Sequence, residues 1–386
     1  MMVRVTQGVK SVKQNVSLSP RLLELMETFR LMVNDAGRIG LQENVTALKS
    51  LSVKTYRQLA KYHVPSRYKA SAISTATGIL RNYRRMKREK PETKTPYAKK
   101  LMLTTYLGFK IDQGILTIPC GDKEYDREYE YVALNKHTLD VLSQPDIRIR
   151  SITLTPQTLG IVYSKEVVDV EPSGLIGIDR NLDNVAIATL EGGYKTYDLS
   201  EATQIKAKYR EVKSHFKRND ARIGRKIFGK YGRKQRNKVG QILNCVSKAI
   251  VEEAKAKGFG IVMENLKGIR KLYRKGNGQS RNYRAKLNGW SFYELQRQIE
   301  YKAKWQDIKV IYVPPHGTSS NCAICGSHVT ECAERLVLCP THGFEDRDVN
   351  AAKNIAARGM RFVPVGSPGE AMVASLQQGA KSMETR

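Results

Sequence analysis

The sequence predicts an α/β domain in the second half of the chain, and a β-barrel interrupted by a helical insertion in the first half. Three successive patterns in the sequence predict this arrangement. Apolar residues recur with helical spacing up to about residue 92, and apolar and polar residues then alternate up to about residue 170. Beyond that point, short apolar strands are separated by helical stretches. A length of 386 residues, of which 41% are apolar, allows two or three domains with real cores.

The first half is expected to contain two kinds of structure. Residues 18–92 are predicted to be a small helical domain, because Ser19 and Pro20 provide an N-cap and a first-turn proline ahead of apolar residues at helical spacing. Residues 1–17 and 93–170 are predicted to supply strands, with a hairpin that turns at Asp112, Gln113 and Gly114. If both strand segments join one barrel, the helical domain is an insertion in it.

The second half, residues 171–361, is expected to form the α/β domain. The expected strands lie at 175–179, 185–190, 194–199, 259–265 and 308–315. Helices are expected over 203–257 and near 290–305. Residues 362–386 are polar and interrupted by proline and glycine, which predicts a flexible tail.

The charge of the chain points to a polyanionic partner. Sixty-six Lys and Arg residues against 37 Asp and Glu residues give a formal net charge of +29. Nucleic acid is the expected partner, with an anionic membrane surface as the competitor. The sequence contains no apolar run long enough for a spanning helix and no signal-peptide pattern, so a soluble, intracellular protein is expected.

Four cysteines and a histidine near the C-terminal end predict a zinc ribbon over 316–344. Cys322 and Cys325 form one pair, and Cys339 and His342 form a second pair with the same spacing. Four such ligands would enclose one structural Zn²⁺, with a hairpin over 327–338 between the pairs. Spacing favours His342 as the fourth ligand, and Cys332 is the alternative. The competing interpretation is a loop with free thiols.

Three acidic residues follow or open buried elements, where a carboxylate is unfavourable without a cation. Asp179 and Glu264 each end an apolar strand, and Asp348 opens a helix. If the strands are neighbours, the three carboxylates would meet and would bind Mg²⁺ for phosphodiester chemistry. Each residue also has an ordinary explanation: Asp348 or Asp346 as a helix cap, Glu264 as a turn cap, and Asp179 as a partner of Arg180.

Basic runs with interleaved tyrosines predict contacts with nucleic acid. Fourteen Lys or Arg residues lie between positions 206 and 238, and eight lie between 266 and 286. Lysine and arginine neutralise phosphates, and tyrosine stacks on bases. A merely solvated basic face is the alternative. The candidate contact residues are Arg81, Arg84, Arg85, Lys206, Lys213, Arg218, Arg225, Lys226, Arg270, Lys271, Tyr273, Arg274, Arg281 and Tyr283.

Four segments in this order resemble the TnpB family of transposon-encoded, RNA-guided nucleases, which are related to type V CRISPR effectors. They are GIDRNLDN (177–184), IVMENL (261–266), PPHGTSSNCAICG (314–326) and CPTHGFEDRDVNAAKNIAARG (339–359). The resemblance is dense over about 171–360 and only general over the first 170 residues. The family's ribbon typically has four cysteines, so His342 is a departure.

The resemblance implies an RNase H-like, RuvC-type nuclease domain over 171–361 with an inserted zinc ribbon. Its catalytic, Mg²⁺-binding carboxylates would be Asp179, Glu264 and Asp348, the last chosen over Asp346 by the family pattern Asp-x-Asn-Ala-Ala. Two Mg²⁺ ions, or Mn²⁺ in vitro, would serve the reaction. Residues 1–17 with 93–170 would be a wedge β-barrel, and residues 18–92 a helical recognition domain.

The implied partners are a guide RNA from the transposon end, double-stranded target DNA with a short adjacent motif, and, functionally, a separate transposase. No membrane partner is implied, and a nucleoid-associated protein of the prokaryotic cytoplasm is expected. Three alternatives remain open: a nuclease-inactive RNA-guided repressor, a guide-independent RuvC-type nuclease or transposase accessory protein, and a zinc-ribbon binder without chemistry. Retention of all three carboxylates disfavours the first, and the long N-terminal half disfavours the second.

Overall fold

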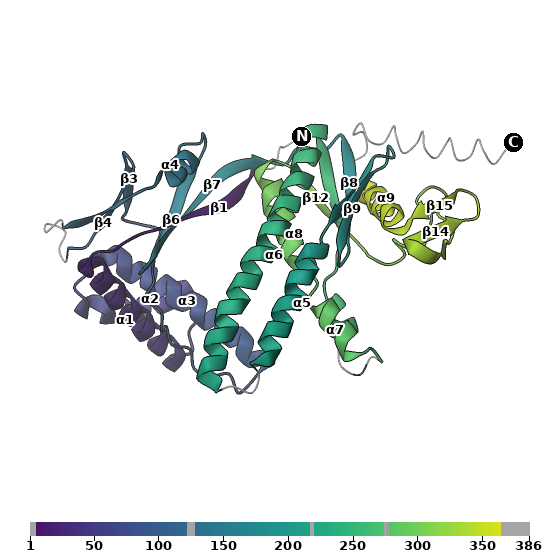
Figure 1. Ribbon diagram of the computed structural model, residues 1–386. Coiled ribbons are helices and arrows are strands. Elements are labelled where there is room, and N and C mark those ends of the chain that lie inside the picture. The colour runs from purple at the N-terminus through teal and green to yellow at the C-terminus, as the bar shows by residue number, and fades with distance from the viewer. Residues whose placement is uncertain (1–4, 122–127, 217–219, 274–275, 277, 364–386) are drawn as a thin grey trace. The chain divides into compact units, whose positions relative to one another are not determined.

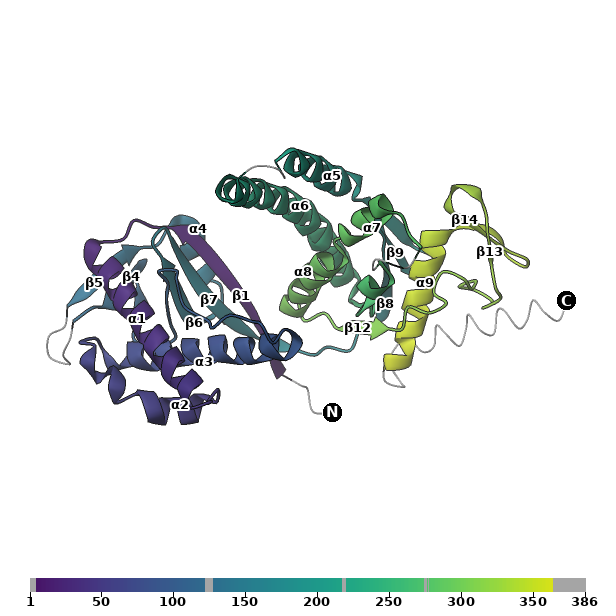
Figure 2. The ribbon, with the colours of Figure 1, turned by 90° about the horizontal axis from the view of Figure 1, so that it is seen from below.

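The computed structural model describes residues 5–121, 128–216, 220–273, 276 and 278–363 of the chain (Figures 1 and 2). The chain divides into two compact units, one formed by Val9–Glu166 and the other by the remaining residues on either side. The expected tail from residue 364 onward lies outside the described residues, as do the candidate contact residues Arg218 and Arg274. None of the described helices is both long and apolar enough to cross a bilayer.

The helical part of the first unit lies between its strands in the sequence. Its helices are α1 (Pro20–Gln42), α2 (Leu48–Thr55), the 3₁₀ helix η1 (Gln58–Lys61) and α3 (Ser66–Glu89). The Ser19 side chain accepts a hydrogen bond from the Leu22 amide at 3.2 Å and Pro20 is in the first turn, as the sequence predicts. Helices α1 and α3 bury apolar side chains such as Phe29 and Leu80.

The strands of the first half form two separate sheets. One has the order β1-β7-β6-β2, and the other has the order β3-β4-β5 and is followed by helix α4. The bounds are β1 (Val5–Asn15), β2 (Leu103–Thr105), β3 (Lys110–Asp112), β4 (Ile115–Pro119), β5 (Tyr129–Ala133), α4 (Lys136–Leu142), β6 (Arg148–Thr155) and β7 (Thr158–Val168). The expected hairpin is confirmed, since β3 and β4 pair around Gln113 and Gly114, both with positive φ.

The expected closed barrel is not seen in the described part of the chain. Alternation of apolar and polar residues identifies a strand and its buried face, but it does not identify which sheet edges pair. Strands β2 and β3 are only three residues long, which leaves little edge for pairing between the two sheets.

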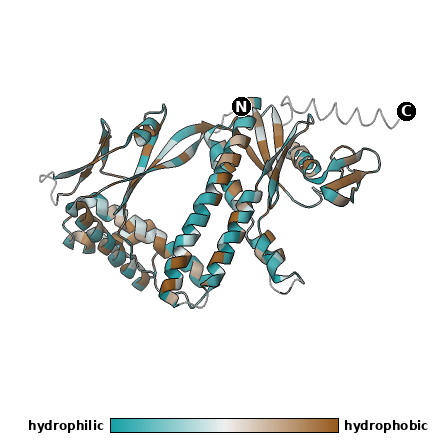
Figure 3. Cartoon of the chain, viewed as in Figure 1, coloured by the Kyte–Doolittle hydropathy of each residue, from teal (hydrophilic) through white to brown (hydrophobic). Residues whose placement is uncertain are grey.

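The second unit is built on a five-stranded mixed sheet with the order β10-β9-β8-β11-β12. Strand β8 pairs in parallel with β11 and β11 with β12, while β9 is antiparallel to both β8 and β10. The strands are β8 (Gly174–Arg180), β9 (Asn184–Thr189), β10 (Tyr194–Asp198), β11 (Phe259–Glu264) and β12 (Val310–Val313). Hydrophobic residues are frequent within these strands (Figure 3), and their side chains form part of the hydrophobic core of the second unit.

Helices cover both faces of this sheet (Figure 2). Helices α6 and α8 pack on one face through a core that includes Leu243, Ile250 and Ile299, and α9 packs on the other through Ile355 and Ala352. The bounds are α5 (Ser200–His215), α6 (Ala221–Lys257), η2 (Ile269–Tyr273), α7 (Arg281–Asn288), α8 (Phe292–Trp305), α9 (Arg347–Gly359) and η4 (Met360–Phe362).

Two details differ from the sequence prediction. The helical stretch expected over 203–257 is two helices, because Asp220 caps a new helix by accepting from the Arg222 amide at 2.6 Å. Helix α7 was not predicted. A small antiparallel sheet precedes α9 and consists of β13 (Thr330–Glu331), β14 (Leu336–Cys339) and β15 (Gly343–Asp346), with the 3₁₀ helix η3 (Ala333–Arg335) between β13 and β14.

Candidate active site and metal centre

Three carboxylates from three elements line one cavity. Ile178 of β8 and Met263 of β11 are register partners in a parallel pair, so the next residues, Asp179 and Glu264, leave the same edge of the sheet. Asp348 lies in the first turn of α9. All three line a cavity of about 220 Å³ that also includes Trp290. The structure therefore brings together the three acidic residues that the sequence singles out.

The close approach of α9 to β8 depends on a residue without a side chain. A Cβ at Gly177 would lie 2.0 Å from the Ala352 carbonyl oxygen and 2.5 Å from the Ala356 amide nitrogen. Both atoms belong to the backbone of α9, which cannot move aside as a side chain does. Glycine at position 177 therefore lets α9 lie directly on β8. This contact brings Asp348 of α9 to the cavity that Asp179 of β8 also lines.

Each carboxylate accepts a hydrogen bond from a neutral side chain. Asn181 donates to Asp179 Oδ2 at 2.8 Å, and Thr318 donates to Glu264 Oε1 at 2.6 Å. Asn184 donates to Asp348 Oδ2 at 3.0 Å. Such bonds fix the direction of an oxygen without neutralising its charge.

The electrostatics of the cavity favour the binding of a cation. Burial, and then the charge of Glu264, raises the pKa of Asp179 to about 7, and burial raises the pKa of Glu264. The one cation bound to this trio in the described residues is Arg335, whose guanidinium lies 2.7 Å from Asp348 Oδ1. Crowded carboxylates with raised pKa values are stabilised by a bound divalent ion.

Arg180 does not pair with the carboxylate of its neighbour, Asp179. Its side chain is almost fully buried, and it donates to the Glu264 carbonyl oxygen and to Gln296 Oε1, the latter at 2.9 Å. The ordinary explanation of Asp179 as a partner of Arg180 is therefore wrong. Arg180 instead holds the backbone of β11 at the point where Glu264 begins to line the cavity.

The donor atoms of the carboxylate trio fit a hard divalent cation such as Mg²⁺. All three side chains offer oxygen ligands, and the cavity is roomy enough for water as well. Each carboxylate also retains an oxygen to which none of the three neutral donors is bonded.

The second cluster consists of Cys322, Cys325, Cys339 and His342. One ligand atom from each lies within 4.8 Å of all the others. The Cys325 and Cys339 sulfurs are 3.5 Å apart, and His342 Nδ1 is 3.6 Å from the Cys322 sulfur. Three thiols and one imidazole in this arrangement suit tetrahedral Zn²⁺. His342 rather than Cys332 is the fourth member, because Cys332 donates instead to the Thr330 carbonyl oxygen.

The basic candidates of the second unit fall into two groups. Lys206, Lys213 and Arg270 line a second cavity, of about 450 Å³, that shares Trp290 with the carboxylate cavity. Burial lowers the pKa of Lys206 to about 8, with a smaller contribution from Arg270. The other described candidates lie on α6, η2 and α7 and do not line it: Arg225, Lys226, Lys271, Tyr273, Arg281 and Tyr283.

Similarity to known proteins agrees with this geometry. The family model described as "Cas12f1-like, TNB domain" matches residues 292–355. A TnpB-like protein of Methanocaldococcus jannaschii is 28% identical over 242 residues, which cover 60% of this chain and 85% of that protein. The sequence of the chain is therefore similar to that of a TnpB-like protein over more than half of its length.

Other relatives match shorter parts of this chain. InsQ of Escherichia coli, named as a candidate RNA-guided DNA endonuclease, is 29% identical over 51% of this chain and 52% of InsQ. The CRISPR-associated endodeoxyribonuclease Cas12f1 of Sulfoacidibacillus thermotolerans is 35% identical over 28% of this chain and 25% of its own.

Solved structures share the fold of this chain at low identity. A Cas12f1 chain in a complex with sgRNA and target DNA aligns with a TM-score of 0.64 at 16% identity, over 88% of this chain and 83% of that one. The mini-RNA-guided endonuclease CRISPR-Cas_phi3 aligns with a TM-score of 0.52 at 12% identity, over 93% of each chain.

Sequence reasoning missed several residues around the carboxylate trio. Asn181 and Asn184 had a signal, because both lie within five positions of Asp179. Thr318 and Arg335 had none, since a threonine near the start of the ribbon and an arginine inside its hairpin look like ordinary loop residues. Their placement depends on how the ribbon folds back against the sheet.

Proposed function

We propose that the chain is an RNA-guided DNA endonuclease that hydrolyses target DNA at the Asp179, Glu264 and Asp348 site. The observation that carries the proposal is the convergence of these three carboxylates, from β8, β11 and α9, on one cavity. The strand order with β9 antiparallel supports an RNase H-like, RuvC-type domain. Similarity to a TnpB-like protein and to proteins named as endonucleases supports the same reaction class.

The three carboxylates would hold Mg²⁺, with two ions as the expected number. When bound there, Mg²⁺ would polarise the phosphoryl group and stabilise the attacking and leaving oxygens. The chain's own residues position the groups that bind it: Asn181, Thr318 and Asn184 each orient one carboxylate. Arg335 places a positive charge beside Asp348, where it would pair with a phosphate oxygen of the DNA.

The cluster of Cys322, Cys325, Cys339 and His342 would hold one structural Zn²⁺. With four protein ligands, no position remains for a reactive water. The ribbon is tied to α9, because Asn350 accepts from the Ala323 amide and donates to the Asn321 carbonyl oxygen, both at 2.9 Å. Zinc would therefore support the position of Asp348 through the ribbon.

The partners we propose are a guide RNA from the transposon end and double-stranded DNA with a short adjacent motif. The aligned Cas12f1 structure contains sgRNA and target DNA, and the net charge of +29 suits two nucleic-acid partners. In this proposal residues 18–92 act as the recognition domain, residues 1–17 and 93–170 as the wedge, and 171–361 as the nuclease domain. Functional association with a separate transposase, in the prokaryotic nucleoid, belongs to the same proposal.

The test begins with expression of the chain beside its native flanking DNA, purification at high salt, and sequencing of the RNA that co-purifies. We expect one discrete RNA, and Mg²⁺-dependent cleavage of DNA that matches its end. Asp179→Ala, Glu264→Ala and Asp348→Ala should each reduce cleavage at least about 100-fold while leaving RNA binding intact.

Three results would contradict this proposal. Cleavage without RNA would indicate a guide-independent nuclease. RNA-directed DNA binding without cleavage would indicate a repressor. Cleavage retained by one of the three variants would remove that residue from the site. Asp183→Ala is a matched control, because Asp183 lies in the same turn as Asn181 and Asn184 but pairs with Lys286 and does not line the cavity.

A further inference from the structure

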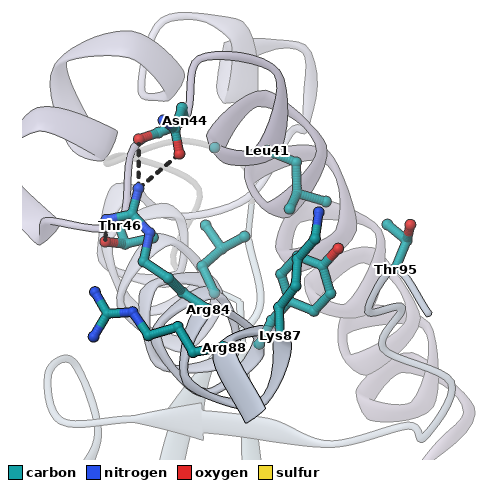
Figure 4. Close-up of a pocket in the computed structure, with 10 residues that line it drawn as sticks. Leu41, Asn44, Thr46, Arg84, Lys87, Arg88 and Thr95 are labelled. Atoms are coloured by element: carbon teal, nitrogen blue, oxygen red, sulfur yellow. Dashed lines mark hydrogen bonds between the residues drawn. The ribbon is translucent and has the colours of Figure 1, made fainter. Parts of the chain in front are cut away.

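A third cavity lies within the helical part of the first unit, and its residues are not used by the proposed nuclease site. It has a volume of about 470 Å³, within the range of ligand-binding pockets. Leu41 of α1 provides apolar surface above the buried Leu80 of α3, and Tyr83 adds an aromatic ring. The remaining lining residues are Gly40, Asn44, Thr46, Arg84, Lys87, Arg88 and Thr95 (Figure 4).

The charge of this cavity is positive and is not cancelled by acidic side chains. Three of its lining residues are basic and none is acidic. Within the described residues, Lys87 and Arg88 form no ion pair, and Lys87 lies over the Tyr83 ring at 5.7 Å. The nearby Glu43 is already paired with Lys54 at 2.6 Å.

Arg84 is held in place by neutral acceptors. Its guanidinium donates to the Asn44 carbonyl oxygen at 3.1 Å, to Asn44 Oδ1 at 2.7 Å and to Thr46 Oγ1 at 3.1 Å (Figure 4). Asn44 has a φ of 51°, a left-handed conformation that asparagine tolerates. Neutral acceptors orient the guanidinium without removing its charge, so it remains available to an anion.

Interaction with the helix dipole, rather than with a bound anion, is a weaker explanation for these basic residues. Lys87 and Arg88 lie in the last turn of α3, where cations interact favourably with the helix dipole. That effect does not account for Arg84, which is bonded to the loop after α1, nor for the apolar and aromatic surface beside it. The basic side chains of the cavity suit the phosphate of a nucleotide. The aromatic ring of Tyr83 and the aliphatic side chain of Leu41 suit its base.

We propose that this cavity binds an unpaired nucleotide of RNA. A base-paired nucleotide is stacked inside its duplex and does not enter a cavity of this size, whereas the bases of RNA loops and bulges can be splayed out. Tyr83 and Leu41 would contact the base, and Arg84, Lys87 and Arg88 the flanking phosphates. The identity of this RNA as the guide rests on the proposed function, whereas the binding itself does not.

The experiment uses the full chain and a single-stranded oligouridine that carries 4-thiouridine. Light-induced cross-links, located by mass spectrometry, should fall on residues 81–95, and unlabelled single-stranded RNA should compete better than duplex DNA. Lys87→Gln combined with Arg88→Gln should weaken RNA binding about tenfold. The same double variant should lower the salt slope by roughly 0.7 for each phosphate that the protein no longer neutralises.

Arg38→Gln is the matched control, because Arg38 lies in the same helical part of the chain, pairs with Asp35 and does not line the cavity. Arg84→Gln is read together with a thermal melt, because it also releases the loop after α1. Equal loss of RNA binding in the control and the double variant, cross-links elsewhere, or better competition by duplex DNA would each overturn the proposal. None of these measurements needs a guide or cleavage, so its failure is distinct from failure of the proposed nuclease.

Discussion

The Asp346 carboxylate accepts a hydrogen bond from the backbone amide of Asp348 at 2.8 Å and a second from Val349 at 3.0 Å. Asp346 is therefore the N-cap of α9, and the Asp348 side chain is left to line the carboxylate cavity. Two aspartates that are two positions apart thus have different physical roles.

This division of roles predicts different effects for the two aspartates. Asp346→Ala should lower the free energy of unfolding by about 1 kcal/mol through loss of the cap. Asp346→Ser should restore that stability, since serine also caps, and cleavage should persist in it. Asp348→Asn should abolish cleavage with little change in a thermal melt. Loss of cleavage in the stable Asp346→Ser variant would show that the Asp346 carboxylate itself belongs to the site.

The raised pKa of Asp179 predicts a pH-dependent stability without metal. Folding raises this pKa from its ordinary value of 3.8 to about 7, so the folded state binds a proton more tightly than the unfolded chain. The associated stability is present below about pH 4 and is lost as the pH rises to 7, at about 1.4 kcal/mol for each unit of pKa.

Asp179→Asn removes this titration. In EDTA, the variant and the unchanged protein should be similarly stable near pH 4, and the variant should be the more stable by up to a few kcal/mol at pH 8. Chemical denaturation at both pH values measures the difference. Added Mg²⁺ should stabilise only the unchanged protein, and an equal response of both proteins would contradict a site that includes Asp179.

The contact between β8 and α9 predicts a large effect of a small substitution. Gly177→Ala would place a Cβ against the α9 backbone, and we expect it to cost about 1–3 kcal/mol through overpacking and to displace Asp348. Gly240→Ala on α6 is the control, because a Cβ there meets nothing within 4 Å and should stabilise by up to about 1 kcal/mol. Denaturation midpoints would show whether the two substitutions differ in sign.

The Cys/His cluster predicts one tightly bound zinc per chain. Cys339→Ser should lose it, whereas His342→Cys should retain it, because thiolate can replace imidazole as a ligand. Cys332→Ser should have no effect on metal content, since Cys332 is outside the cluster. Elemental analysis of the purified proteins measures the zinc, and loss of zinc from the Cys332→Ser variant would contradict the assigned fourth ligand.

The ion pair between Arg335 and Asp348 predicts that substitution of Arg335 reduces DNA cleavage but not RNA binding. Arg335→Ala removes the cation beside Asp348, and we expect cleavage to fall roughly 10- to 100-fold with RNA binding retained. Arg335→Lys should recover part of the rate. Glu334→Gln, in the same 3₁₀ turn, is the control, and single-turnover cleavage rates compare the three variants. Equal rates for Arg335→Ala and the unchanged protein would leave Arg335 with no role at the site.

Features of this protein that depend on local pattern could be predicted from short segments of the sequence. The apolar strands that end at Asp179 and Glu264, the paired Cys-x-x-Cys and Cys-x-x-His spacings, and the cap and proline that start α1 are all readable in short windows. Local pattern also marked the basic runs, although not which of their members meet at one cavity.

The partners of side chains and strands that lie far apart in the sequence became known only from the tertiary structure. In the folded chain, Asp346 is the N-cap of α9 and His342 is the fourth member of the cluster. Arg180 donates to the Glu264 carbonyl oxygen instead of pairing with Asp179, and Arg335 pairs with Asp348. The strands of the first half are divided between two open sheets. Periodicity specifies which face of an element is buried, whereas partners across the fold are set by the packing of those faces against one another.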